Sequence, residues 1–172
     1  MAGSLGSDDF DDFVVARSPA LLQAAWLLTG DWQRGEDLLQ TSLARAYLAW
    51  QRIRPGGHEA YVRRILVNTY ATWWRRAWRG ETPHARLPER PDVAADYESV
   101  ELRRELQQAL AALTRRQRAT VVLRFYCDLS EAETAAAMDC SVGTVKSQTA
   151  RALSRLRQSP PLRSVHEGTN HD

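Results

Sequence analysis

A proline-rich stretch divides the chain and limits what it can fold into. Pro83, Pro88 and Pro91 lie among charged residues in the 17-residue segment Gly80–Asp96. Proline cannot continue a helix and favours extended backbone at the residue before it. On either side, apolar residues recur at helical spacing, and no segment alternates with a period of two. The sequence therefore predicts an all-α fold of two small helical domains, residues 8–80 and 97–158, joined by a flexible linker over residues 81–96.

Seven helices are predicted from this spacing, three before the linker and four after it. The second domain is thus expected to be a four-helix domain. The predicted ranges are Asp9–Leu28, Trp32–Gln51, Glu59–Trp78, Tyr97–Leu113, Thr114–Cys127, Glu131–Met138 and Val142–Leu156. Ser159 and two prolines end the last helix, and residues 159–172 are expected to form a disordered tail.

The composition excludes several classes of protein. With 44% hydrophobic and 26% charged residues, the chain is typical of a soluble globular protein. It has neither a secretory leader nor an 18-residue apolar run, so we expect no membrane partner and a cytoplasmic location. Cys127 and Cys140 are too far apart for a CxxC motif, and we expect reduced thiols without a metal or other cofactor. The absence of a glycine-rich phosphate loop or a nucleophile motif argues against an enzyme.

Charge is unevenly distributed although the net charge is only +2. The N-terminus carries four aspartates between Asp8 and Asp12, whereas Arg63–Arg90 and Lys146–Arg157 are basic. Two separate phosphate-binding surfaces would produce this pattern. Solvated helix faces would produce it as well, so the charge pattern alone leaves both interpretations open.

The strongest local motif is a helix-turn-helix between Leu129 and Arg157. Ser130 followed by Glu133 predicts a capping box at the start of a short alanine-rich helix. A turn over Asp139–Ser141 follows, in which Asp139 tolerates the left-handed conformation and Ser141 can cap the next helix. Small alanines in the first helix allow the two helices to cross closely.

The second helix of this motif has one apolar face and one face without any acid. Val142, Val145 and Ala152 are predicted to face inward, together with Thr149, Leu153 and Leu156. The opposite face is small, polar and basic, which suits the major groove of DNA. An ordinary helical hairpin with a cationic surface is the alternative. The candidate DNA-binding residues are Gly143, Thr144, Lys146, Ser147, Arg151 and Arg155.

A second motif combines tryptophans and arginines between Tyr61 and Glu81. Trp73, Trp74 and Trp78 are too many for so small a core, so we expect at least one exposed aromatic platform. Exposed aromatic rings among arginines suit unstacked bases and single strands. The alternative is that the aromatic rings fill the core and that the arginines solvate its rim.

The chain resembles the extracytoplasmic-function (ECF) sigma factors, a family of bacterial transcription initiation factors within the sigma-70 superfamily. Leu28–Trp50 resembles the polymerase-binding helix of the family, with an acidic-Leu-x-Gln core at Asp37–Gln40, and Glu59–Asn68 resembles the helix that meets the −10 element. Leu113–Ala152 resembles the domain that reads the −35 element. The tryptophan-rich sequence is most similar to those of actinobacterial, SigE-like members.

This resemblance implies partners and roles for particular residues. It implies that Asp37 and its neighbours bind the clamp helices of the largest subunit of core RNA polymerase, that the second domain reads promoter DNA at −35, and that the loop Arg54–Glu59 captures a flipped −10 base. An anti-sigma factor is a further candidate partner. The implied polymerase-binding residues are Glu36, Asp37, Gln40 and Leu43, and the implied −10 residues are His58, Arg63, Arg64, Asn68, Arg75 and Arg76.

The linker length agrees with this scheme. The two promoter elements lie about 70 Å apart, at ~35 Å per helical turn of DNA. The linker reaches about 58 Å when extended, at ~3.4 Å per residue. Two domains with radii of gyration near ~11 Å bridge the remaining distance. Two other functions remain open: a helix-turn-helix regulator that acts without core polymerase, and an adaptor whose basic faces bind proteins.

Overall fold

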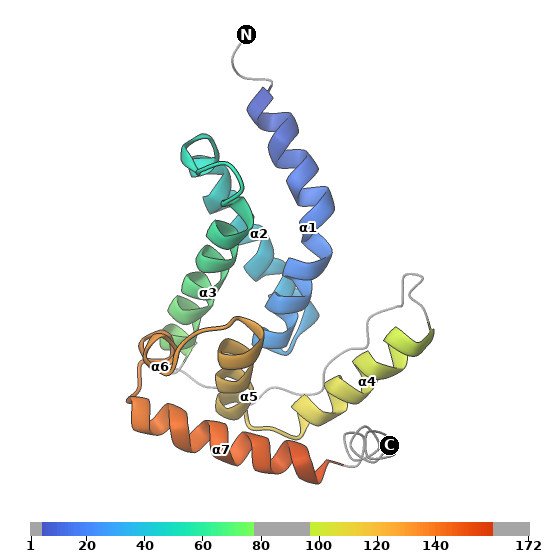
Figure 1. The fold of residues 1–172 in the computed structure, drawn as a ribbon, viewed down its shortest axis with the longest axis vertical. Coiled ribbons are helices and arrows are strands. Elements are labelled where there is room, and N and C mark those ends of the chain that lie inside the picture. Colours follow the sequence, from blue (N-terminus) through green and yellow to red (C-terminus); the bar gives the residue numbers. More distant parts are fainter. Residues whose placement is uncertain (1–4, 78–96, 160–172) are drawn as a thin grey trace, which may run out of the picture.

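The regular structure of the described chain is helical throughout. The computed structural model describes residues 5–77 and 97–159, and within these ranges it contains no strand (Figure 1). The elements are α1 (Leu5–Thr29), α2 (Trp32–Ala49), the 3-10 turn η1 (Trp50–Arg52), α3 (His58–Ala77), α4 (Tyr97–Ala111), α5 (Arg115–Val121), the π-helical turn η2 (Val122–Tyr126), α6 (Glu131–Met138) and α7 (Val142–Gln158). The predicted all-α fold is confirmed.

The predicted helices are present with small changes at their ends. The predicted helix Thr114–Cys127 is divided, because the backbone widens into the π-helical turn η2 after Val121. The first helix begins four residues earlier than expected, at Leu5. The predicted linker, and the predicted tail beyond Ser159, lie outside the described residues, so the domain boundaries stay a prediction.

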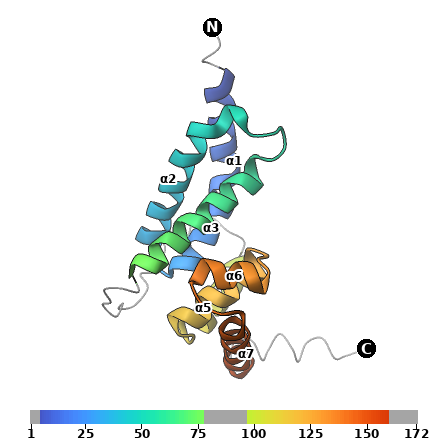
Figure 2. The same cartoon turned by 90° about the vertical axis from the view of Figure 1, so that its left-hand side faces the viewer.

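The first half of the chain is a bundle of three helices. α1 and α3 both pack against α2, and α1 also contacts α3 (Figure 2). Leu21 and Leu28 of α1 meet Leu38 of α2 and Leu66 of α3 in the interior, each no more than 2% exposed. The α1–α2 turn is made by Gly30, whose φ of +70° lies in the left-handed region that favours glycine.

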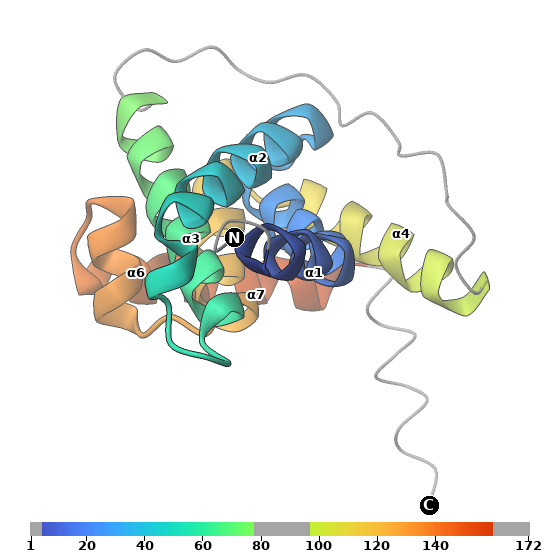
Figure 3. The ribbon, with the colours of Figure 1, turned by 90° about the horizontal axis from the view of Figure 1, so that it is seen from above.

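The second half is built around α5 and α7. α5 and α6 both pack against α7, whose Val145 and Ala152 are buried. Leu123 and Met138 complete the apolar contact between these elements. α4 precedes them and leads away from the α1–α3 bundle (Figure 3).

The two halves share one hydrophobic core. Buried residues of the second half, including Leu113, Val122 and Met138, belong to the same cluster as Leu21 and Leu66 of the first half. α6 packs against α3, and α5 packs against α1 (Figures 1 and 2). Among the described residues, no helix has the length and apolar character that crossing a membrane requires.

The N-terminus of α6 has the predicted capping box. The Glu133 backbone N–H donates to Ser130 Oγ at 3.0 Å, and the Ser130 N–H donates to Glu133 Oε2 at 2.7 Å. These hydrogen bonds lower the pKa of the Glu133 carboxyl below its usual value. Two otherwise unpaired helix N–H groups are thus satisfied locally.

We expect Ser130→Ala to lower the free energy of unfolding by about 1 kcal/mol, because the first turn of α6 loses its side-chain acceptor. Urea unfolding followed by circular dichroism measures this change. Ser154→Ala, at an exposed position within α7, is the control and should stay close to the unsubstituted chain. Equal stabilities for the two variants would contradict a stabilising role for the capping box.

Candidate nucleic-acid interface

The turn of the helix-turn-helix forms as the sequence predicts. Asp139 ends α6 in the left-handed conformation, with φ of 52° and ψ of 53°. Ser141 then caps α7, because its Oγ accepts the Thr144 backbone N–H at 3.1 Å. α7 therefore begins at a fixed angle to α6, which is the arrangement that presents a helix to the major groove.

The predicted outer face of α7 is the accessible one. Thr144 is half-buried, and its hydroxyl lies 2.9 Å from that of Ser141. Val142, which was predicted to face inward, is 39% exposed because it precedes the first contact of α7 with the core. The other candidates on this face are exposed: Gly143, Lys146, Ser147, Arg151 and Arg155.

Three of these side chains have contacts within the described chain. Lys146 Nζ lies 3.8 Å from Glu131 Oε2, and Arg155 Nη1 donates to the Ala112 carbonyl at 3.3 Å. The Ser147 hydroxyl donates to the Thr144 carbonyl of its own helix at 3.0 Å. These are exposed contacts of small energy, so the side chains can exchange them for phosphate or base atoms.

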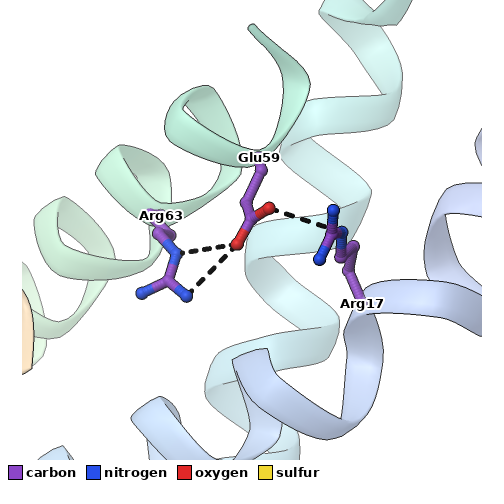
Figure 4. A network of polar contacts seen from close by, with 3 residues as sticks. All are labelled: Arg17, Glu59 and Arg63. Carbon is purple, nitrogen blue, oxygen red and sulfur yellow. Dashed lines mark hydrogen bonds and ion pairs between the residues drawn. The ribbon is translucent and has the colours of Figure 1, made fainter. Parts of the chain in front are cut away.

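The beginning of α3 contains an ion-pair network. Glu59 pairs with Arg17 of α1 at 3.3 Å and with Arg63 at 3.2 Å (Figure 4). His58, the residue before it, packs its ring on Trp50 with centroids 4.2 Å apart. The candidate −10 residues His58 and Arg63 therefore have defined partners within the chain, and His58 is mainly a packing residue in this structure.

A cavity of about 680 Å³ lies beside the loop that precedes α3. Ile53, Arg54 and Gly57 line it from the loop, and Tyr61 and Arg64 line it from α3. The Arg64 guanidinium lies 5.5 Å from the centroid of the Tyr61 ring. An aromatic ring, a cation and free space next to a loop are what a flipped base needs. The sequence reasoning predicted this loop but did not identify Tyr61.

The remaining −10 candidates are exposed along α3. Asn68, Arg75 and Arg76 are accessible, and Arg75 Nε donates to the Ala71 carbonyl one turn earlier. Val67 and Ala71, which lie on the same helix between these residues, are only 9% and 3% exposed. They are buried because the second half of the chain packs against this side of α3.

The expected aromatic platform is not found at Trp73 or Trp74. Trp74 is 4% exposed, and the Arg115 guanidinium lies 5.2 Å from its ring centroid. Trp73 is half-buried against the core. These two tryptophans thus follow the alternative interpretation, in which aromatic rings fill the core, and Trp78 lies outside the described residues.

Arg63 lines the same cavity as Cys127 and Asp128 of the second half. Burial raises the pKa of the Cys127 thiol to about 11, and the positive charge of Arg63 opposes this rise. Burial likewise raises the pKa of Tyr126, and Arg63 again opposes the rise. A cation predicted to guide DNA therefore lies next to the segment that follows η2.

The candidate polymerase surface on α2 differs from the prediction at one residue. Glu36, Asp37 and Gln40 are exposed on one side of the helix. Leu43 was predicted to join them, but it is only 6% exposed and packs in the core, so it is removed from this surface. Leu48, 79% exposed, lies two turns beyond Gln40 on the same side. The helical spacing of Gln40, Ala44 and Leu48 would have identified it.

Comparisons with known proteins find a family match in each half of the chain. The Sigma-70 region 2 family matches residues 13–80, and the family described as Sigma-70, region 4 matches residues 103–156. An RNA polymerase sigma-E factor of Streptomyces coelicolor is 42% identical over 158 residues, covering 91% of this chain and 89% of that protein. The ECF RNA polymerase sigma factor SigE of Mycolicibacterium smegmatis is 32% identical over 156 residues, covering 86% of this chain and 60% of that protein.

Solved structures show the same fold. The sigma factor RpoE of Bartonella quintana, in complex with the anti-sigma factor NepR, aligns with a TM-score of 0.56 at 24% identity. The alignment covers 90% of this chain and 97% of that one. With two sigma-70 regions matched in order and close relatives matched over most of their length, the chain belongs to the extracytoplasmic-function sigma factors, the proteins that bind core RNA polymerase and direct it to promoters.

Proposed function

We propose that this chain performs sigma-factor function through three surfaces, one on α7, one at the start and along the side of α3, and one on α2. The observation that carries the proposal is that the two sigma-70 regions match in order, over residues 13–80 and 103–156, and each contains its own exposed basic surface. Promoter-specific initiation by the complex with core polymerase is the activity that tests it. The proposal assigns no catalytic step to the chain.

The surface on α7 reads the −35 element in the major groove. Arg151 is exposed in the middle of the acid-free face and can bind guanine with two hydrogen bonds. Thr144 and Ser147 flank it with hydroxyl groups, and Lys146 and Arg155 lie at the edges of the face, where phosphates pass. Base reading and backbone holding thus fall to different residues of one helix.

The surface on α3 binds the non-template strand of the −10 element. The cavity beside the loop receives a flipped base between Tyr61 and Arg64. Asn68, Arg75 and Arg76 continue along the same helix and guide the backbone, as does Arg63 once it leaves Glu59. Stacking on the aromatic ring contributes affinity without a strong sequence preference. The cations contribute the part of the affinity that depends on salt concentration.

The surface on α2 docks on the clamp helices of the largest polymerase subunit. Asp37 and Gln40 provide the polar contacts, with Glu36 beside them. Leu48 provides the exposed apolar area that the buried Leu43 cannot supply. Complementary charge orients the complex, and the apolar contact stabilises it. A cytoplasmic location follows from this partner, and an anti-sigma factor, such as the NepR bound to the RpoE structure, is a further candidate partner.

We expect Asp37→Arg to abolish binding to core polymerase while the fold stays intact, because an exposed acid facing a complementary surface becomes a repulsive cation. A pull-down with purified core enzyme measures binding, and circular dichroism checks the fold. Asp12→Arg, an exposed acid on α1, is the control for charge reversal. Undiminished binding by Asp37→Arg would rule out this docking face.

Leu48→Glu is expected to weaken core binding about ten-fold. Burial of a largely exposed leucine at an interface contributes about 1–2 kcal/mol to the binding free energy, and the substitution removes this contribution. Val15→Glu is a closely matched control, since Val15 on α1 is 80% exposed. Titration of labelled chain with core enzyme gives both dissociation constants. If both substitutions weaken binding equally, Leu48 has no specific place in the interface.

Arg151→Ala should reduce binding of the polymerase complex by about 1–3 kcal/mol at one −35 base pair and relax specificity there. Lys146→Ala should instead weaken binding by a similar factor on every sequence, because phosphates carry no sequence information. Fluorescence anisotropy on a set of −35 single-base variants separates the two patterns. A uniform loss for Arg151→Ala would assign this residue to the backbone.

A further inference from the structure

A cavity of about 390 Å³ lies where the C-terminal ends of α1 and α3 meet the start of α5. It shares no lining residue with the cavity beside the loop that precedes α3. α5 packs against α1 (Figure 1), so both halves of the chain contribute walls to this cavity. A cavity of this size can hold one small molecule.

Three arginines from three different helices line this cavity. Arg34 lies in the first turn of α2, Arg76 near the end of α3 and Arg115 at the start of α5. No aspartate or glutamate is among the described residues that line it. Asp31, three residues before Arg34, accepts the Arg34 backbone N–H at 2.9 Å as the N-cap of α2. The cavity therefore attracts an anion, and guanidinium groups are well suited to phosphate because they can donate two parallel hydrogen bonds.

Aromatic rings from the C-terminal part of α3 form the rest of the polar and aromatic lining. Trp73 is half-buried, so its ring packs against the core and also lines the cavity. Trp74 is 4% exposed, and the Arg115 guanidinium lies 5.2 Å from its ring centroid. Bases stack on aromatic side chains, and arginines add cation–π attraction. A site with both kinds of group favours a ligand that is aromatic as well as anionic.

The hydroxyl of Tyr70 is a buried donor in the same cavity. Tyr70 is 5% exposed, and its Oη makes no hydrogen bond to any described residue. Burial raises the pKa of Tyr70 to about 12, although the charges of Arg118 and Arg115 oppose the rise. The hydroxyl therefore stays protonated at neutral pH. A buried polar group without a partner is destabilising, and a ligand that accepts its hydrogen bond removes this cost.

We propose that this cavity binds a free nucleotide, with its base against Trp73 and its phosphates between Arg34, Arg76 and Arg115. The Tyr70 hydroxyl donates a hydrogen bond to an oxygen of the ligand. The rings favour a nucleotide over inorganic phosphate, and the arginines favour it over an uncharged nucleoside. This inference goes beyond the proposed function and does not depend on binding to promoter DNA or to core polymerase.

Isothermal titration calorimetry of the full chain with each of the four ribonucleoside triphosphates tests the proposal. At least one is expected to bind with a stoichiometry of one per chain. Its nucleoside and inorganic triphosphate should each bind about ten-fold more weakly or worse, because each lacks either the charged or the stacking contact. Absence of binding by all four nucleotides would overturn the proposal. Equal affinities for inorganic triphosphate and the nucleotide would also overturn it, since the rings would then contribute nothing.

Arg34→Gln should weaken nucleotide binding about ten-fold, because it removes one hydrogen-bonded charge from the phosphates. Arg34 belongs to none of the three surfaces proposed for promoter and polymerase binding. Arg104→Gln removes the same charge from an exposed position on α4 and serves as the matched control, which should retain full affinity. Equal losses in the two variants would show that only the net charge matters, and would overturn the site.

Tyr70→Phe separates a role in ligand binding from a role in folding. Because the hydroxyl has no partner among the described residues, its removal should leave the free energy of unfolding unchanged or raise it. Nucleotide affinity should nevertheless fall about ten-fold, the effect of losing one hydrogen bond to a charged oxygen. Urea unfolding and calorimetry of the same variant measure the two quantities. Unchanged affinity would overturn the role of Tyr70.

A labelled single-stranded oligonucleotide of mixed sequence distinguishes a free nucleotide from a nucleotide within a DNA strand. Fluorescence anisotropy measures its binding to the unsubstituted chain and to Arg34→Gln. If the occupant is a free nucleotide, the substitution should leave oligonucleotide binding unchanged while it weakens nucleotide binding. A ten-fold loss for both ligands would assign the cavity to a DNA strand and overturn the proposal. Neither measurement contains polymerase, so failure of the proposed function would appear separately, as an absence of core binding by the unsubstituted chain.

Discussion

Burial of α3 on two sides is the constraint on which the rest of the structure depends. Val62 and Leu66 attach the helix to α1 and α2, while Val67 and Ala71 receive the second half of the chain. The arginines of the same helix lie at the border of the second contact. One helix therefore carries both the apolar contact between the halves and the charged surface that is proposed to bind DNA.

The helix-turn-helix differs because local interactions hold it together. The capping box of α6, the left-handed Asp139 and the Ser141 cap all lie within a dozen residues of one another in the chain. Val145 and Ala152 then attach α7 to elements of its own half. None of these contacts involves the first half. The helix-turn-helix therefore owes its internal geometry to residues of the second half alone.

This contrast explains which features the sequence could predict. Helix ends, caps and the exposed face of α7 depend on residues close in the chain, and their residue types and spacing indicate them. The burial of Val67 and Ala71, and the π-helical turn after Val121, depend on the packing of one half on the other, which no local pattern encodes. The burial of Leu43 could be predicted only in part. Helical spacing places leucines on two sides of α2, and only the packing of the bundle decides which side is internal. Leu48, by contrast, lies at helical spacing from the polar residues Asp37 and Gln40, and their polarity together with the spacing indicates an exposed position.

The near-neutral charge of the chain is consistent with a protein that binds DNA only within a larger complex. Lys146 pairs with Glu131, and Arg63 pairs with Glu59, so two of the cations proposed to hold phosphates already have carboxylate partners. Replacing an exposed carboxylate by a phosphate gains little, because such pairs contribute at most about 1 kcal/mol. The free chain therefore gains little from non-specific contact with DNA. In the proposed complex polymerase fixes α3 at the −10 element, so that the tethered α7 meets the −35 element at a high effective concentration. Weak individual contacts then suffice for binding to the promoter. The low net charge of the chain limits non-specific binding to other DNA and so favours specificity.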